Sequence, residues 1–555
     1  MAASGDAAYS CHSMTDSTTT STNSYDEVPY PSSAFRSTSP DTLATLATLV
    51  GMTPAPVQKC RVLELGCSDG GNLLPMAYAL TGSEFVGIDL SARQIEAGQA
   101  FLKELGLKNA TLKKCDLMSV DDSFGAFDFI VAHGIYSWVP PEMQDRILDI
   151  CKSRLRSNGV AFVSYNTYPG WHMRGMIREM MLYRIRKESG AEPRIAGARA
   201  WLDYLANTVG TPDTAQFTAT DTTAYGAALR YERGLLGQYR DSYLYHEHLE
   251  AINEPVYFHR FIERAAGHGL QYLSEADFTS AQISNYPPAV AESLRGITND
   301  LIELQQYMDF VSNRTFRQTV LCHQETALNR TPDPAKLSPF YVASPIKPAS
   351  ETVDLHSLKE EAFNSHVGKT LTAGAPIVKA AMLILGESWP RSVAFEALLA
   401  AARERLNPGA PAVYTVEHLA SDAQAVGQVL LYCFAQGMVE FHVCPPLYRT
   451  EISGQPAASL VARLQARTEQ IVTNMRHEQV TLTDEVSRHL LVYLDGARNH
   501  ADLFNSLAKM AADGVVVVES GDGKPLGEGE ELNTKLLEKL NLTLQGLAGA
   551  ALLVG

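Results

Sequence analysis

The sequence of 555 residues has no apolar run that approaches the roughly 20 residues needed to span a membrane. Its first residues, MAASGDAAYSCHSMTDS, contain neither a basic patch nor an apolar stretch, which argues against a secretory signal. The eight cysteines are scattered and form no CxxC pair, so neither a zinc site nor a disulfide framework is indicated. We therefore expect a cytoplasmic protein without membrane insertion.

Basic residues are also in short supply, because 46 Lys and Arg face 62 Asp and Glu and the formal net charge is −16. Such a charge repels phosphate backbones, which makes nucleic acid a poor partner. With 45% hydrophobic and 19% charged residues, the composition is otherwise that of an ordinary globular protein. The chain is too long for a single hydrophobic core, and we expect about three domains.

Short apolar segments alternate with helical patterns from position 61 to 166. We predict strands over 61–66, 84–89, 110–117, 128–133 and 159–166, and helices over about 71–81, 91–106 and 141–156. Repeats of this kind form right-handed units on a parallel sheet. Segments 269–276 and 316–323 could complete the sheet after a largely helical stretch. The predicted fold is therefore α/β, a Rossmann-like seven-stranded core with a helical insertion.

Changes in composition along the chain predict its domain boundaries. The later helical patterns each end in a short β-rich piece, which predicts an α+β, winged-helix-like C-terminal region, and the proline-rich segment RTPDPAKLSPFYVASPIKPAS marks its beginning. The predicted parts are a Ser/Thr-rich disordered tail (1–24), an arm and helix (25–55), the core (56–171 and 266–325), the helical insertion (172–265), a middle winged-helix-like domain (326–455) and a C-terminal domain (456–555).

The motif VLELGCSDGGN (62–72) joins the first strand to a helix. Its glycines allow a tight turn and the close approach of a ligand. It is not a phosphate-binding G-x-x-x-x-G-K-[ST] loop, because no Lys follows, and Ser68 replaces the middle glycine of G-x-G-x-x-G. Glu64 would repel a pyrophosphate, but it suits a cofactor that carries a sulfonium and an α-amino group.

Two further acids end the next strands. Asp89 in VGIDLS stands where Rossmann-type folds bind ribose hydroxyls, and Asp116 in KKCDLMS could accept from an adenine amino group or cap a helix. Acids at three successive strand ends are the pattern of class I S-adenosylmethionine-dependent methyltransferases, which this segment resembles. The cofactor residues predicted here are Glu64, Gly66, Cys67, Ser68, Gly70, Asn72, Asp89, Leu90, Asp116, Leu117 and His133.

Aromatic side chains follow the fourth and fifth strands, in AHGIYSWVPP (132–141) and SYNTYPGWH (164–172). The reacting partner should arrive over these strand ends, where aromatic faces attract the cationic methyl donor by ~0.5–2 kcal/mol each. The predicted catalytic residues are His133, Tyr136, Trp138, Tyr165, Asn166, Tyr168 and Trp171. Core packing of Tyr136 and Trp138, and a structural hydrogen bond from His133, remain open alternatives.

An amine acceptor must lose a proton before it attacks. A Tyr, a His, or the carboxylate of Asp26 or Glu27 could accept that proton, and the sequence does not choose among them. His246 and Glu250 share a helix face, but no third ligand stands at a suitable spacing, so no metal is predicted.

Several longer segments resemble bacterial methyltransferases that carry a methyltransferase regulatory domain, among them the rickettsial protein lysine methyltransferases that modify a surface outer-membrane protein. These segments are YDEVPYPS, VLELGCSDGGN, HGIYSWVP, SYNTYPGWH, NEPVYFHRF and DFVSNRTFRQTVLCH. The resemblance spans about Tyr25 to His323 and is weaker beyond.

The resemblance implies S-adenosylmethionine as cofactor, S-adenosylhomocysteine as product and lysine side chains of a protein as acceptors. It also implies that Tyr25–Ser32, with Tyr25 and Tyr30, closes over the cofactor, and that the insertion has a regulatory or dimerising role in a homodimer. Two other hypotheses stay open: a small-molecule N- or O-methyltransferase of a biosynthetic pathway, and a non-catalytic S-adenosylmethionine-binding regulator.

Overall fold

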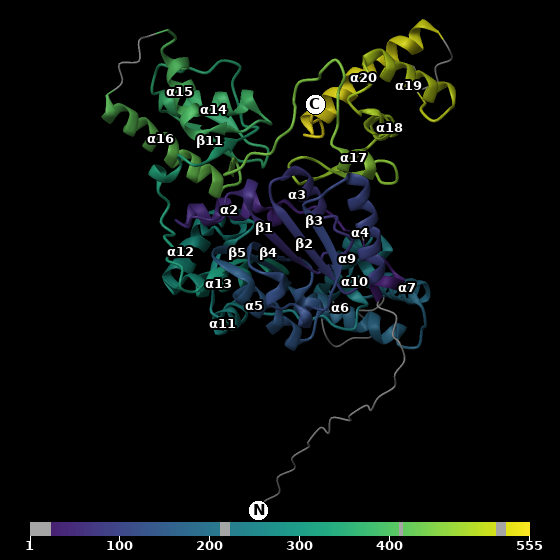
Figure 1. Ribbon diagram of the computed structural model, residues 1–555. Helices are drawn as coiled ribbons and strands as arrows, with labels where there is room; N and C mark the ends of the chain where they lie inside the picture. Colours follow the sequence, from purple (N-terminus) through teal and green to yellow (C-terminus); the bar gives the residue numbers. More distant parts are fainter. Residues whose placement is uncertain (1–23, 31, 211–222, 410–414, 518–528) are drawn as a thin grey trace, which may run out of the picture.

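The computed structural model describes residues 24–30, 32–210, 223–409, 415–517 and 529–555. The predicted tail, 1–24, lies outside these ranges except for its last residue. Figure 1 shows a large body built around one sheet and two smaller lobes that stand apart on the same side of it. Within the described ranges, no helix has the length and apolar character to cross a membrane.

Seven strands form the central sheet in the order β3-β2-β1-β4-β5-β7-β6. Strands β1 to β5 are parallel, and β7 runs antiparallel between β5 and β6. The bounds are β1 Arg61–Leu65, β2 Glu84–Asp89, β3 Ala110–Lys114, β4 Phe127–Ala132, β5 Leu155–Asn166, β6 Leu270–Glu275 and β7 Phe316–His323. The predicted seven-stranded α/β core is confirmed, and its strand order reverses between β1 and β4, where such folds bind ligands.

The central strands are apolar on both faces because helices cover both sides of the sheet. Every residue of β4 is buried. Three helices connect the parallel strands: α3 Leu73–Ala79, α4 Ala92–Leu105 and α5 Pro141–Arg154. Helix α4 begins where the Ser91 side chain accepts the Gln94 amide, and it ends at Gly106 with a left-handed backbone. The first cap fixes the loop after β2, and the second turns the chain toward β3.

The helical insertion after β5 has an apolar core of its own. It contains α6 Gly170–Ile185, α7 Ala191–Thr208, α9 Thr223–Leu236 and α10 Asp241–His248. The next helix, α11 Phe258–Gly267, instead packs Phe261 and Ala265 into the cluster beneath the sheet. By its packing α11 belongs to the core, although the prediction extended the insertion to position 265. Helices α12 Pro288–Ile297 and α13 Leu301–Ser312 lead back to β7.

The N-terminal arm crosses the core before the first strand. It holds the short helix α1 Ser24–Glu27, a 3₁₀ turn at Arg36–Thr38 and helix α2 Pro40–Leu49. Ser39 caps α2, and its side chain accepts the Thr42 amide. Apolar residues of α2, such as Leu43 and Leu46, are buried in the same cluster as those of β1. The arm is therefore part of the folded body.

The two lobes of Figure 1 each have a separate apolar core. The middle lobe holds two three-stranded sheets and three helices: β8 Tyr341–Ala343, β9 Lys347–Pro348, β10 Glu361–Asn364, β11 Thr370–Ala373, α14 Pro376–Ser388, β12 Val393–Ala394, α15 Phe395–Leu406, α16 Val416–Ala435 and β13 Glu440–His442. The C-terminal lobe holds α17 Leu460–Gln465, a hairpin of β14 Ile471–Thr473 and β15 Gln479–Thr481, α18 Glu485–Tyr493, α19 His500–Ala512 and α20 Glu530–Gly549.

Candidate cofactor and acceptor sites

The loop after β1 is shaped by left-handed residues. Gly66 and Gly70 have φ of 70° and 80°, and Ser68 has φ of 53°. At Gly71, a Cβ atom would lie 2.8 Å from the backbone oxygen of Ser32 in the arm. The arm therefore lies directly against the loop, and any side chain larger than hydrogen at Gly71 would displace it.

Two polar atoms of this region have no hydrogen-bond partner within the described chain: Glu64 Oε2 and Ser68 Oγ. The other oxygen of Glu64 accepts from Asn72 Nδ2 at 2.7 Å. Burial raises the pKa of Glu64 to about 8. Buried polar atoms are rarely left unsatisfied, so the loop has the acceptor and hydroxyl groups that a cofactor with an ammonium and a carboxylate would complete.

Asp89, at the end of β2, is held by backbone amides. Its carboxylate oxygens accept from the amides of Ser68 at 2.9 Å and Ser91 at 2.8 Å, and burial raises its pKa. A carboxylate has about four acceptor positions, so two remain for a pair of vicinal hydroxyls. The carboxylate therefore keeps acceptor capacity for hydroxyl groups such as those of a ribose.

The end of β3 differs in part from expectation. The Asp116 carboxylate accepts the Met118 amide at 2.9 Å and so caps the following 3₁₀ turn, which is one of its two predicted roles. Leu117 is buried in the core, whereas Met118 is 57% exposed and Leu90 58% exposed. Because β2 and β3 are neighbours, both strand ends expose an apolar side chain on the same edge of the sheet. Met118 escaped prediction because nothing in KKCDLMS distinguishes it from Leu117.

The other predicted cofactor residues lie in this loop and in the N-terminal arm. Cys67 is buried, and its Sγ lies so close to Gly87 that a Cβ there would be 2.8 Å away. Tyr30 makes an edge-to-face contact with His246 at 5.4 Å. The side chain of Tyr25 lies outside the described part of the structure.

The arm uses both of its acidic residues as anchors. Asp26 Oδ1 accepts from the Ser91 hydroxyl at 2.5 Å. Glu27 accepts from the Tyr245 hydroxyl at 3.0 Å and from the Ala191 amide at 2.9 Å. These contacts tie the arm to the start of α4 and to the insertion, so neither carboxylate is left free to serve as the base considered for it.

On the acceptor side, Tyr136 and Tyr165 are core residues. Both are buried, and Tyr165 stacks on Phe261 at 4.1 Å and places its hydroxyl 2.9 Å from Thr319 Oγ1. Asn166 is buried as well and donates to Asn253 Oδ1 at 3.1 Å. The prediction grouped these three with the catalytic residues, but the structure gives each of them packing or hydrogen-bond partners inside the protein.

His133 also has a structural environment. Its Nδ1 lies 2.8 Å from Ser164 Oγ, and its ring meets Phe35 edge to face at 4.1 Å. Burial lowers the pKa of His133 to about 4, so the ring is neutral at neutral pH and too weak a base to take a proton from an ammonium. The structural alternative is the better account of His133.

Partly exposed aromatic rings remain after β4 and β5. Trp138 meets the buried Trp171 nearly at right angles, with centroids 6.4 Å apart. Tyr168 stacks on His172 at 4.1 Å, and His172 Nε2 lies 3.0 Å from the hydroxyl of Tyr257. Trp171 Nε1 is buried without a partner among the described residues. Tyr257 was missed by the prediction, although it stands in the segment NEPVYFHRF.

The histidine considered for a metal has other contacts. His246 Nδ1 lies 2.7 Å from Glu250 and its Nε2 lies 2.6 Å from the Val28 carbonyl oxygen in the arm. Across the described ranges, no three His, Cys, Asp or Glu side chains gather as metal ligands would.

Asn72 connects the loop to distant parts of the chain. Its Oδ1 accepts the Phe35 amide at 3.0 Å and lies 2.9 Å from His477 Nε2, while its Nδ2 donates to Glu64. His477 is buried in the turn between β14 and β15, with φ of 60°. One amide side chain therefore joins the arm, the first strand and the hairpin of the C-terminal lobe.

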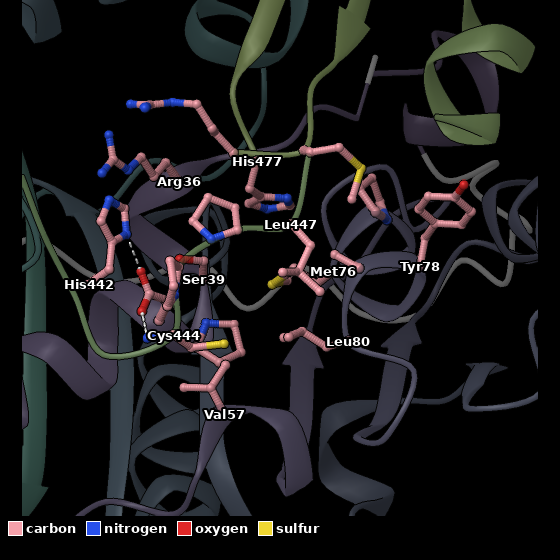
Figure 2. Close-up of a pocket in the computed structure, with 18 of the residues that line it drawn as sticks. Arg36, Ser39, Val57, Met76, Tyr78, Leu80, His442, Cys444, Leu447 and His477 are labelled. Atoms are coloured by element: carbon pink, nitrogen blue, oxygen red, sulfur yellow. Dashed lines mark hydrogen bonds and ion pairs between the residues drawn. The ribbon is translucent and has the colours of Figure 1, made fainter. Parts of the chain in front are cut away.

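A cavity of about 380 Å³ lies on the other side of His477, where the arm, α3 and both lobes meet. Figure 2 shows apolar side chains of Met76, Leu80 and Leu447 directed into it, with Arg36 and His442 at one side. His442 Nδ1 is bound to Asp41 at 2.7 Å and Arg36 to Glu440 at 2.8 Å. None of the predicted cofactor or acceptor residues lines this cavity, so it is separate from the site at the strand ends.

Family models match three stretches of the chain. A model described as a methyltransferase domain matches residues 62–159. A second, described as a predicted methyltransferase regulatory domain, matches 240–323. A third, described as the PKMT C-terminal winged helix domain, matches 454–552 and covers the C-terminal lobe.

Whole-length similarity is also found. An uncharacterized protein of Rickettsia prowazekii is 33% identical over 540 residues, which cover 96% of this chain and 94% of that protein. A second R. prowazekii protein is 40% identical over 242 residues, 44% of this chain and 93% of its own length. The structure of PKMT2 from Rickettsia typhi in complex with AdoHcy superposes with a TM-score of 0.82 at 31% identity, over 95% of this chain and all (100%) of that chain.

Proposed function

The chain belongs to the family of S-adenosylmethionine-dependent protein lysine methyltransferases that includes PKMT2 of Rickettsia typhi, and on that premise we propose how its own residues bind the cofactor and the acceptor. The acceptor is a lysine side chain of a protein, and the resemblance to the rickettsial enzymes makes a surface protein our first choice. The observation that carries the proposal is the loop after β1. There, Glu64 Oε2 and Ser68 Oγ are buried beside Asp89 without a hydrogen-bond partner among the described residues.

The residues divide by the part of the cofactor that they fit. Glu64 suits the α-ammonium group, Asp89 the ribose hydroxyls, and the exposed side chains of Leu90 and Met118 the two faces of adenine. When bound, the cofactor supplies an activated methyl group on a sulfonium. Trp138 and Tyr168 lie at the neighbouring strand ends, where partly exposed rings attract cations, and we assign them to the lysine side of the site.

The proposal is tested by incubating the protein with cofactor labelled in its methyl group and with proteins of a bacterial lysate. We expect label on protein lysines, identified by mass spectrometry. Trp138→Ala should lower turnover at least about 10-fold while cofactor affinity stays within about twofold, because an aromatic face at a desolvated site is worth up to ~2 kcal/mol. Label found only in small molecules would refute the assignment to protein lysine.

Cofactor binding should release a proton from Glu64. The pKa of this carboxyl is raised to about 8, so it is mostly protonated at pH 7, and an ammonium bound to it would favour the ionised form. Affinity attributable to Glu64 should rise as pH increases from 6 to 8 and level off above, where the group is already ionised. Titration calorimetry in buffers of different ionisation enthalpy should show about one more proton released by the wild type than by Glu64→Gln at pH 7. Equal release by both proteins would contradict this role.

A further inference from the structure

A row of side chains on the insertion faces the arm. Tyr243 and Glu247 lie one turn apart on α10, and Tyr239 lies just before this helix begins at Asp241. The rings of Tyr239 and Tyr243 stack with centroids 4.2 Å apart. Tyr30 of the arm lies beside them, since its ring meets His246 of the same helix edge to face at 5.4 Å, and burial together with the charge of Glu247 raises the pKa of its hydroxyl. Two segments far apart in sequence thus enclose one carboxyl with tyrosine rings.

Glu247 differs from the acids around it because it has no hydrogen bond or ion pair within the described part of the chain. On the same helix, His246 lies 2.7 Å from Glu250 and His248 lies 2.9 Å from Glu232. Arg174, whose charge acts on Glu247, is itself bound to Glu232 at 3.0 Å and lies over the ring of Trp171 at 4.8 Å. The carboxyl of Glu247 is therefore open to a ligand.

The surroundings of Glu247 bring the pKa of its carboxyl close to neutral pH. Burial raises its pKa to about 7, against the opposing charges of Arg174 on α6 and His246 on α10 and with the reinforcing charge of Glu232 on α9. Its side chain still retains partial solvent access. An acid with a pKa near the working pH can both attract a cation and accept its proton.

The position of this carboxyl links the two halves of the proposed site. In the arm, Tyr30 stands between Asp26, which is bound beside Asp89, and Ser32, which lies against Gly71 of the cofactor loop. Arg174 donates to the Tyr243 hydroxyl at 3.5 Å and lies over the ring of Trp171, which in turn contacts Trp138. Glu247 is thus flanked by the arm over the cofactor loop and by the aromatic side chains after β4 and β5.

We propose that Glu247, enclosed by Tyr30, Tyr239 and Tyr243, receives the ammonium group of the acceptor lysine and takes up its proton. This inference rests on the proposed function. The carboxylate accepts one proton from the ammonium and leaves a neutral amine. The nitrogen lone pair then forms the bond to the methyl carbon while the carbon–sulfur bond breaks, and its electron pair stays on sulfur, which becomes a neutral thioether. The proton leaves Glu247 for solvent before the next turnover.

The test compares Glu247→Gln with Glu192→Gln, which removes the same charge from an exposed position on α7 of the same insertion. We expect Glu247→Gln to lower kcat about 100-fold or more, the range of general base catalysis, and to abolish the acidic limb of the kcat/KM profile near pH 7. Glu247→Asp should recover part of the activity. Cofactor affinity should be unchanged in both variants, and Glu192→Gln should behave as the wild type.

Two readouts separate a ligand-binding role from a structural one. Because Glu247→Gln removes a buried charge that has no partner, the midpoint of thermal unfolding above pH 7 should stay equal or rise. With S-adenosylhomocysteine present, n-butylammonium, which imitates the lysine side chain, should bind the variant at least about 10-fold more weakly. A variant with wild-type kcat and pH profile, or one that unfolds at lower temperature and loses cofactor affinity in parallel, would overturn the assignment.

The butylammonium measurement also keeps this inference distinct from the proposed function. If the wild-type protein binds cofactor but methylates no protein, the proposed function fails. Weaker butylammonium binding by Glu247→Gln would still support the cation site, and equal binding by both proteins would still refute it.

Discussion

Replacement of Asp89 by alanine should weaken the binding of S-adenosylmethionine by at least about 10- to 100-fold, since a hydrogen bond to a charged group contributes ~1.5–3 kcal/mol. The loss has a second source. The Asp89 carboxylate also holds the amides of Ser68 and Ser91 at the end of β2, so its removal loosens the loop that must close around the cofactor. Titration calorimetry with S-adenosylmethionine and with S-adenosylhomocysteine measures the effect directly.

Two further variants serve as comparisons for Asp89→Ala. Asp89→Asn keeps the shape and part of the hydrogen bonding, so its loss should be smaller than that of Asp89→Ala. Asp513→Ala removes an acid from an exposed position in the C-terminal lobe and should leave cofactor affinity unchanged. If Asp89→Ala bound the cofactor as tightly as the wild type, the ribose could not be bound at the end of β2.

Arg317→Met should have the largest effect on stability, about 3 kcal/mol or more, because it leaves a buried carboxylate without its counter-charge. Arg317 on β7 is fully buried and bound to Glu275 on β6 at 2.8 Å and to Asp309 on α13 at 2.8 Å. For a body of about 300 residues, that loss corresponds to about 5 °C in the unfolding midpoint, measured by calorimetry.

The matched control is Arg405→Met, which breaks a bidentate pair with Glu387 that is open to solvent. Exposed pairs contribute about 0–1 kcal/mol, so its midpoint should barely move. Adding Glu275→Gln to Arg317→Met should recover part of the loss, since the stranded charge is then gone. A double variant no more stable than Arg317→Met would mean that the packing of the arginine over Phe258, at 3.7 Å, carries the effect instead.

Local patterns predicted the strand ends well. Glycines beside acids after successive apolar runs indicate both the sheet and the place where a ligand meets it, and the structure brings Glu64, Asp89 and Asp116 to neighbouring strand ends of one sheet. Burial was harder to predict. Tyr136 follows β4 as Trp138 does, and Tyr165 lies at the end of β5, just before Tyr168. Whether a ring faces the core or the site depends on packing against α11, which lies about a hundred residues later.

Contacts between distant segments could not be predicted from the sequence alone. Asn72 and His477 are 405 positions apart, and no periodic pattern connects them. Glu247 was overlooked for a different reason: Tyr243 and Glu247 have the spacing of any half-exposed helix face. Only the three-dimensional structure shows that the arm places Tyr30 against His246 on the same helix, and that the neighbouring histidines pair with Glu250 and Glu232 instead.

The several hydrogen bonds of the Asn72 side chain have a thermodynamic consequence for binding. Because the same amide group serves the arm, Glu64 and His477, a cofactor that draws Glu64 toward itself alters the hydrogen bonding available to the C-terminal hairpin. Linkage is reciprocal. If bound cofactor raises the affinity of the C-terminal lobe for a partner protein, the bound partner must raise the affinity for the cofactor by the same factor. Binding at the C-terminal lobe and binding of the methyl donor would then be coupled.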